Sequence, residues 1–134
     1  MGLSDYQLEE LRGIFKNYVE LKAVYLFGSY AMGKEGKSSD LDLGIVLAED
    51  YKQQIKLEIL TELAVKGYCK VDLVILNEAD LVTKHEIVKH NKVIYQRADF
   101  DTNDYFSLTM RQFLDFRPFL KVQQRYLKER VLNG

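Results

Sequence analysis

The chain has 134 residues, which suits one domain with a hydrophobic core of its own. Its 19 basic and 20 acidic side chains nearly cancel, which argues against broad, salt-driven binding of nucleic acid. No apolar stretch is long enough to span a membrane, and the single cysteine, Cys69, excludes an intrachain disulfide and favours a cytoplasmic location.

The N-terminal residues predict a helix with a well-defined start. Ser4 can cap it, Gln7 can complete a capping box, and Leu3 with Leu8 can form a hydrophobic staple. Apolar residues then recur at helical spacing, which predicts one buried face made of Leu8, Leu11, Phe15, Tyr18 and Val19.

Helices and strands alternate through the middle of the chain. Gly28 follows the first apolar run, and Gly67 is expected to stop a later helix. The predicted strands are 23–27, 40–47, 71–76 and a short edge strand 93–95; the predicted helices are a first turn at 29–32, then 53–66 and 80–89. This alternation indicates an α/β (α+β) layout with a small sheet, whereas periodicity does not give the strand order.

The tail is predicted to be helical and separate from the core. We expect a core at 1–98 and a C-terminal helical extension at 99–134. Pro118 is the only proline, and because proline is best tolerated at a helix start, it is expected to divide the tail into two helices. The extension is expected to pack on the core, and its aromatic and basic residues also suit contact with a partner protein.

Gly28 and Ser29 form a candidate phosphate site. Glycine lets the backbone come close to a ligand, and the amides and hydroxyl at a helix start can bind a triphosphate. Gly-Ser is a common loop dipeptide, so the pair indicates a function only in combination with acidic residues further along the chain.

Three aspartates form a candidate metal site. Side chains alternate along a strand, so Asp40 and Asp42 share a face, and Asp72 is a charge within an otherwise apolar strand. An Asp-x-Asp pair at a strand start is often only solvated. Together with Asp72, however, it makes a three-carboxylate cluster that could hold two Mg²⁺ ions for in-line displacement at phosphorus.

These residues resemble the signature of the DNA polymerase β-like nucleotidyltransferases. The small size is similar to their minimal branch, the MNT antitoxins of HEPN/MNT toxin–antitoxin pairs. The tail segment 113–118, Phe-Leu-Asp-Phe-Arg-Pro, resembles that branch as well. The resemblance implies a nucleotidyltransferase fold, with a small mixed sheet flanked by helices and a C-terminal helical tail.

The resemblance also implies a function. Asp40 and Asp42 would be the metal-binding catalytic pair, Asp72 the third carboxylate, and Gly28 and Ser29 the triphosphate contacts. The enzyme would transfer AMP from MgATP to a tyrosine of a HEPN-domain toxin and would act as its antitoxin, alone as a homo-oligomer or in a hetero-oligomer with the toxin.

One position departs from the family pattern. Many relatives have an arginine where this chain has Met32, and methionine cannot bind a phosphate. Lys34 or Lys37 could replace that arginine, or could simply be solvated loop lysines.

Other functions remain open at this point. The acceptor could be a small molecule, although the chain has little sequence left for an acceptor pocket. The protein could also neutralise a toxin by binding alone. Nucleic-acid polymerisation is the least favoured, because no separate domains are available to hold a template.

Overall fold

A computed structural model describes residues 2–33, 35–36 and 40–133, with residues 120–133 described by their backbone. Its strands β1 (Leu21–Phe27), β2 (Leu41–Leu47), β3 (Val71–Ile75) and β4 (Val93–Gln96) form one sheet in the order β3-β2-β1-β4. β1 pairs antiparallel with β2 and with β4, while β2 and β3 are parallel. The predicted α/β class with a small mixed sheet is confirmed.

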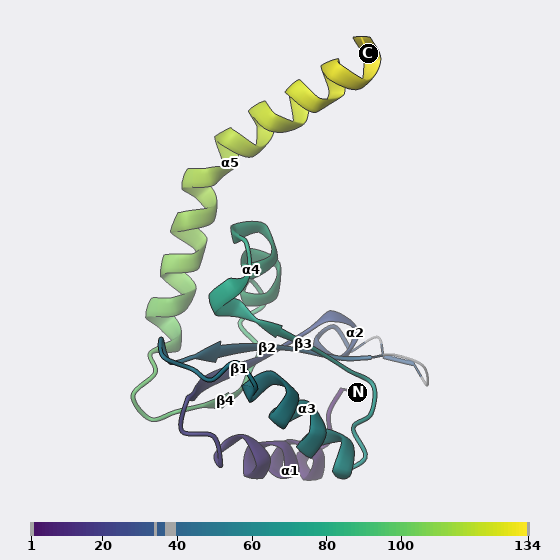
Figure 1. Ribbon diagram of the computed structural model, residues 1–134, viewed down its shortest axis with the longest axis vertical. Helices are drawn as coiled ribbons and strands as arrows, with labels where there is room; N and C mark the ends of the chain where they lie inside the picture. Colours follow the sequence, from purple (N-terminus) through teal and green to yellow (C-terminus); the bar gives the residue numbers. More distant parts are fainter. Residues whose placement is uncertain (1, 34, 37–39, 134) are drawn as a thin grey trace.

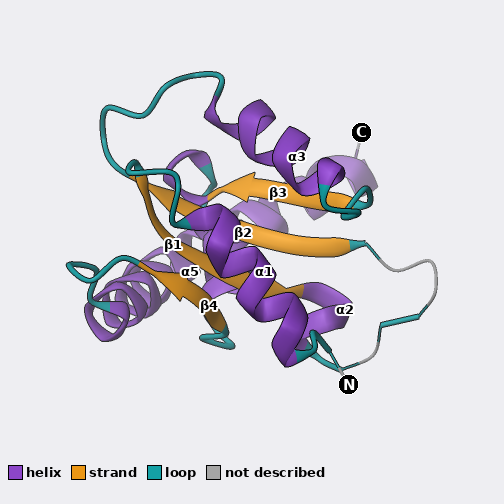
Figure 2. Cartoon of the chain, turned by 90° about the horizontal axis from the view of Figure 1, so that it is seen from below, coloured by secondary structure: helices purple, strands orange, loops and turns teal. Residues whose placement is uncertain are grey.

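Helices cover both faces of the sheet (Figures 1 and 2). α1 (Asp5–Phe15) and α3 (Ile55–Val65) lie against one face, and α4 (Leu81–Val88) lies against the other with the first part of α5 (Thr102–Asn133). Because side chains alternate along a strand, β1 supplies both cores. Val24 points into the core under α1 and α3, and Tyr25 points into the core under α4 and α5.

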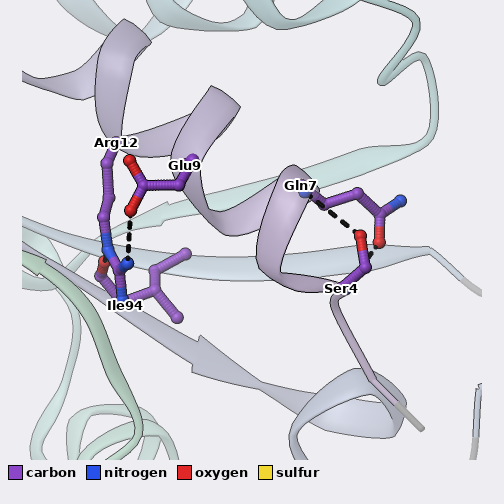
Figure 3. Close-up of polar contacts among 5 residues, drawn as sticks. All are labelled: Ser4, Gln7, Glu9, Arg12 and Ile94. Carbon is purple, nitrogen blue, oxygen red and sulfur yellow. Dashed lines mark hydrogen bonds and ion pairs between the residues drawn. The ribbon is translucent and has the colours of Figure 1, made fainter.

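The start of α1 confirms the predicted capping box. The Ser4 hydroxyl accepts from the Gln7 backbone N–H at 3.1 Å, and the Gln7 side chain accepts from the Ser4 backbone N–H at 2.9 Å (Figure 3). The predicted apolar face extends too far, however. The helix ends at Phe15, so helical spacing no longer applies beyond it, and Val19 is 81% exposed.

Two glycines shape the connections as the sequence suggests. Gly28 has a φ of +70° and turns the chain from β1 into the short helix α2 (Gly28–Ala31). Gly67 has a φ of +98° and follows the end of α3. Only a residue without a side chain adopts these left-handed conformations without strain.

The predicted strands and helices of the core are present with small shifts of their ends. A 3-10 helix, η1 (Leu76–Glu78), follows β3. Asp80 caps α4 by accepting from the Thr83 backbone N–H at 2.8 Å. Gly44 of β2 lies under α4, where an added Cβ would stand 2.7 Å from Cγ2 of Ile87, so glycine is what allows α4 to pack this close.

The tail is one helix, which corrects the prediction of two. Pro118 lies inside α5. A proline within a helix removes one backbone hydrogen bond and bends the axis, and α5 changes direction as it rises away from the sheet (Figure 1). The first part of α5 packs against the core through Tyr105, Phe106 and Met110, and Phe113 stacks on His85 of α4 with ring centroids 3.8 Å apart.

None of the described helices combines the length and the hydropathy that crossing a membrane requires.

Candidate active site

Asp42 lies at the centre of the candidate site. In the register of the sheet it pairs with Phe27 of β1 on one side and with Asp72 of β3 on the other. Gly44, two residues further along β2, contacts α4, so Asp42 lies on the same face of the sheet as α4. The strand pairing therefore brings two of the three predicted acids side by side on one face.

The electrostatics single out Asp42 among the three acids. Burial raises the pKa of its carboxyl above the ordinary value, and the negative charges of Asp72 and then of Asp40 raise it further. No ion pair within the described ranges involves Asp40, Asp42 or Asp72. The three acids therefore form a concentration of negative charge that no ion pair in the described part of the chain neutralises.

Asp40 and Asp72 are more open than Asp42. Asp40 is exposed and comes immediately before β2, while Asp72 is exposed near the start of β3, an edge strand. Both side chains are accessible to a ligand above the sheet face. Asp42 is the partly buried member that they flank.

The three acids do not form a closed cage. Within the described ranges, no group of three or more His, Cys, Asp or Glu side chains has an arrangement that would hold a metal ion as it stands. The joint binding of metal by Asp40, Asp42 and Asp72 therefore stays a prediction. What the structure shows is that Asp42 pairs with Asp72 in the sheet and that the negative charges of Asp72 and Asp40 act on Asp42.

The structure gives a reason for glycine at position 28 that the sequence did not reveal. A Cβ at this position would lie 2.0 Å from Oδ2 of Asp42, in addition to the positive φ. The glycine makes room for the Asp42 carboxylate at the end of β1. Phe27 pairs with Asp42, so the next residue, Gly28, lies beside that carboxylate. This contact can be recognised only once the register of the sheet is known.

Ser29 lies in the first turn of α2 and is half-buried. The first amides of a helix have no acceptor within it, so those of α2 are free of intrahelical bonds. The predicted contacts of Gly28 and Ser29 with a triphosphate stay a prediction. Their position beside Asp42 is the one that this role requires.

Met32 follows α2 and is 50% exposed. Because methionine is uncharged, its side chain adds no positive charge to this end of the sheet. Lys34 and Lys37, the predicted substitutes for the missing arginine, lie outside the described residues.

Comparison with known proteins identifies the family of the chain. The family model described as polymerase beta, nucleotidyltransferase matches residues 9–100. The protein adenylyltransferase MntA of Shewanella oneidensis is 32% identical over 79 residues, which cover 59% of this chain and 57% of that relative, less than two thirds of its length. A provisionally named protein adenylyltransferase of Methanocaldococcus jannaschii is 31% identical over 111 residues, which cover 83% of this chain and 79% of that one.

Solved structures share the fold. A toxin–antitoxin crystal structure with AMP-PNP has a TM-score of 0.70 at 23% identity, covering 97% of this chain and 99% of that one. A structure of a tri-AMPylated Shewanella oneidensis HEPN toxin in complex with its MNT antitoxin has a TM-score of 0.66 at 21% identity, covering 93% of this chain and 95% of that one. At these identities the likeness establishes the fold.

Proposed function

Because the chain belongs to the polymerase beta nucleotidyltransferase family, we propose that it transfers AMP from ATP to a tyrosine hydroxyl of a HEPN-domain toxin and acts as its antitoxin. One observation carries the proposal. Asp42, flanked by two further acids and without an ion pair in the described ranges, lies directly beside the Gly28-Ser29 turn. The acceptor and the biological role follow the relatives named as protein adenylyltransferases and the complexes with HEPN toxins.

The acids suit Mg²⁺ as the cofactor. Mg²⁺ takes hard oxygen ligands and commonly binds one or two carboxylates together with phosphate oxygens and water. Burial, and then the negative charges of Asp72 and Asp40, raise the pKa of Asp42, and a bound cation would offset both effects. Asp40, Asp42 and Asp72 would hold one or two ions. Bound there, Mg²⁺ would neutralise the charge of the triphosphate.

The strand order suits an in-line reaction. β2 lies between β1 and β3, so Asp42 lies between the Gly28-Ser29 turn on one side and Asp72 on the other. We place the triphosphate over the turn, with the first amides of α2 and the Ser29 hydroxyl donating to its oxygens. The acceptor hydroxyl then enters over Asp72, opposite the leaving group.

The proposed transfer exchanges one bond at the α-phosphorus for another. The phenolic oxygen forms a bond to the α-phosphorus, and the bond from that phosphorus to the bridging oxygen of the β-phosphate breaks. Pyrophosphate leaves, and the phenol proton passes to the Asp72 carboxylate. The protein contributes positioning and a fixed electrostatic environment.

The partner would also contact the extension at 99–134. Leu114 and Phe119 of α5 are 58% and 65% exposed. Exposed apolar and aromatic side chains of this kind suit a protein interface. The need for ATP and the exposed, unpaired Cys69 suit a cytoplasmic site for the complex.

Labelling of the partner tests the activity. The chain is incubated with Mg²⁺, α-labelled ATP and a HEPN-domain toxin, and the label is expected on a tyrosine of that protein. Chelation of Mg²⁺ should stop the transfer, and added Mg²⁺ should restore it. No label on the partner under conditions where AMP-PNP binds would contradict the proposal.

Asp42→Asn with a matched control tests the site. Loss of this carboxylate should lower the transfer rate by at least about 100-fold, because a ligand that would hold Mg²⁺ against the triphosphate is gone. Asp50→Asn, an exposed change beyond the other end of β2, should transfer at the parent rate. Because burial and like charges raise the pKa of Asp42, the Asn variant should melt no lower than the parent, which separates loss of chemistry from loss of fold.

A second candidate is a subunit that neutralises its toxin by binding alone. The exposed Met32 favours it, because this side chain cannot bind phosphate. Cells that carry the toxin and the Asp42→Asn variant distinguish the two functions. Protection by that variant would show that binding suffices, whereas toxicity would show that transfer is required.

A further inference from the structure

A groove of about 400 Å³ runs beside Asp72 along the outer edge of the sheet. Its floor is β3, and its walls come from α3 on one face of the sheet and α4 on the other. The side chains that line it from these two walls are Lys56 of α3 and Thr83 of α4. The groove therefore extends from the candidate active site past the far end of β3 to Glu78 of η1.

The floor of the groove has unpaired backbone groups. β3 pairs only with β2 in the described sheet. In a parallel pair, the backbone groups of every second residue of a strand bond to its neighbour. The Leu41 N–H donates to the Lys70 C=O at 2.8 Å, so Lys70 and every second residue after it face β2. By this phase, the backbone groups of Leu73 and Ile75 face the open edge, where an added strand could pair with them.

The ends and walls of the groove are held in place. Asp80 accepts from the Thr83 backbone N–H and so fixes the first turn of α4. Glu78 accepts a hydrogen bond from the Tyr51 hydroxyl at the far end of the groove. The groove is thus a formed feature of the fold whose open end is Asp72.

We propose that this groove receives the acceptor, as an extended polypeptide segment that adds to the open edge of β3 and carries the acceptor tyrosine next to Asp72. The proposal rests on the proposed function and specifies how that site selects its substrate. Strand addition supplies affinity through the backbone and leaves selectivity to side chains at alternate positions.

The geometry of a sheet explains why the tyrosine would reach the site. An added strand would lie about 4.8 Å from β3, and side chains opposite each other in neighbouring strands share a face. A tyrosine opposite Asp72 would therefore point to the face that bears Asp42, on the side away from Gly28 and Ser29. This is the side from which an in-line attack must come.

A bulky wall residue tests the groove. Thr83→Arg fills it, while Val82→Arg makes the same change at the next position of α4, which is 38% exposed and does not line the groove. We expect Thr83→Arg to slow transfer to the HEPN-domain protein at least about tenfold, since 1.4 kcal/mol of lost transition-state binding has that effect. AMP-PNP binding with Mg²⁺ should be unchanged, and Val82→Arg should match the parent in both assays.

A variant on the opposite wall and a direct probe of the edge keep the test decisive if Thr83→Arg fails to fold. Lys56→Glu should slow transfer, and Lys66→Glu, at the other end of α3, should not. In the complex of Asp42→Asn with the HEPN-domain protein, amide hydrogen exchange over residues 71–76 should slow.

The outcomes separate the two claims. Transfer at the parent rate by Thr83→Arg or Lys56→Glu, or unchanged exchange at β3 in the complex, would overturn the groove while leaving the proposed function intact. Absence of transfer by the parent chain would overturn the proposed function and the groove with it.

Discussion

The two faces of the sheet differ in how much of their area is packed apolar core and in whether they bear charged side chains. The face under α1 and α3 is an apolar core whose largest fully buried side chains include Phe15 and Leu63. The face under α4 and α5 has a smaller core and also bears Asp42 and Asp72. Stability and chemistry are therefore divided between opposite faces of the same strands.

Most of the buried polar atoms that lack a partner in the described part of the chain lie on the face that bears the acids. Among the described residues, four buried polar atoms have no hydrogen-bond partner: the Tyr25 hydroxyl, His85 Nδ1 and Gln112 Oε1 on the α4 and α5 side, and Glu35 Oε1 in the loop between α2 and β2. Tyr68, on the other face, donates from its hydroxyl to Glu10 at 2.9 Å. An unpaired buried polar group costs stability, so the face with the acids is also the less optimised one.

The largest expected effect tests the apolar face. Phe15→Ala removes a fully buried ring from the core under α1 and should lower the free energy of unfolding by about 3–5 kcal/mol. Phe106→Ala on the other face should cost roughly half as much, because its ring is only half-buried. Denaturant unfolding measures both, and equal losses would contradict the division of stability between the faces.

Much of the fold follows from local signals in the sequence. Ser4 and Gln7 mark the start of α1 through a reciprocal pair of bonds that needs only four consecutive residues. Gly67 likewise ends α3 through its own backbone conformation. Pro118 misleads for the same reason, because the local rule places proline at a helix start, whereas a long helix can accommodate it by bending.

The candidate site is predictable in part. The alternation of side chains along a strand places Asp40 and Asp42 on one face, and the in-register pairing of Asp42 with Asp72 agrees with the predicted arrangement. The role of Gly28 toward Asp42 and the groove beside β3 both depend on which strands are neighbours. Periodicity does not contain that information, so neither could be found from the sequence.

A pair of glycine variants tests whether the functional face is positioned by its backbone. Gly28→Ala places a Cβ 2.0 Å from Oδ2 of Asp42, and Gly33→Ala has a similar positive φ but nothing within 4 Å of the added atom. Displacement of a catalytic group by about 1 Å can cost about 100-fold in rate, which we expect for Gly28→Ala. Gly33→Ala should lose only about 1 kcal/mol of stability to backbone strain. Similar transfer rates for the two variants would show that Asp42 does not depend on Gly28.

The smallest expected effect compares two tyrosines from opposite faces. Tyr25→Phe removes a hydroxyl that has no partner in the described residues, so stability at neutral pH should be unchanged or higher by up to about 1 kcal/mol. Tyr68→Phe removes the bond to Glu10 and should lower stability by about 1 kcal/mol. Thermal melts at neutral pH measure this difference. A loss in Tyr25→Phe as large as that in Tyr68→Phe would mean that the Tyr25 hydroxyl is satisfied after all.

The same two tyrosines should also differ in how they affect stability at alkaline pH, where their hydroxyls lose protons. Burial raises the pKa of Tyr25 to about 12, and burial together with the bond to Glu10 raises that of Tyr68 to about 12, from an ordinary value of 10.0. Between these values the unfolded chain loses the phenol proton and the folded chain keeps it, so stability falls as pH rises through this window. Each Phe variant should lose stability less steeply there than the parent. Because Tyr25 owes its raised pKa to burial alone, Tyr25→Phe removes this alkaline loss without removing a bond, and it should remain the more stable of the two variants from neutral pH through this window.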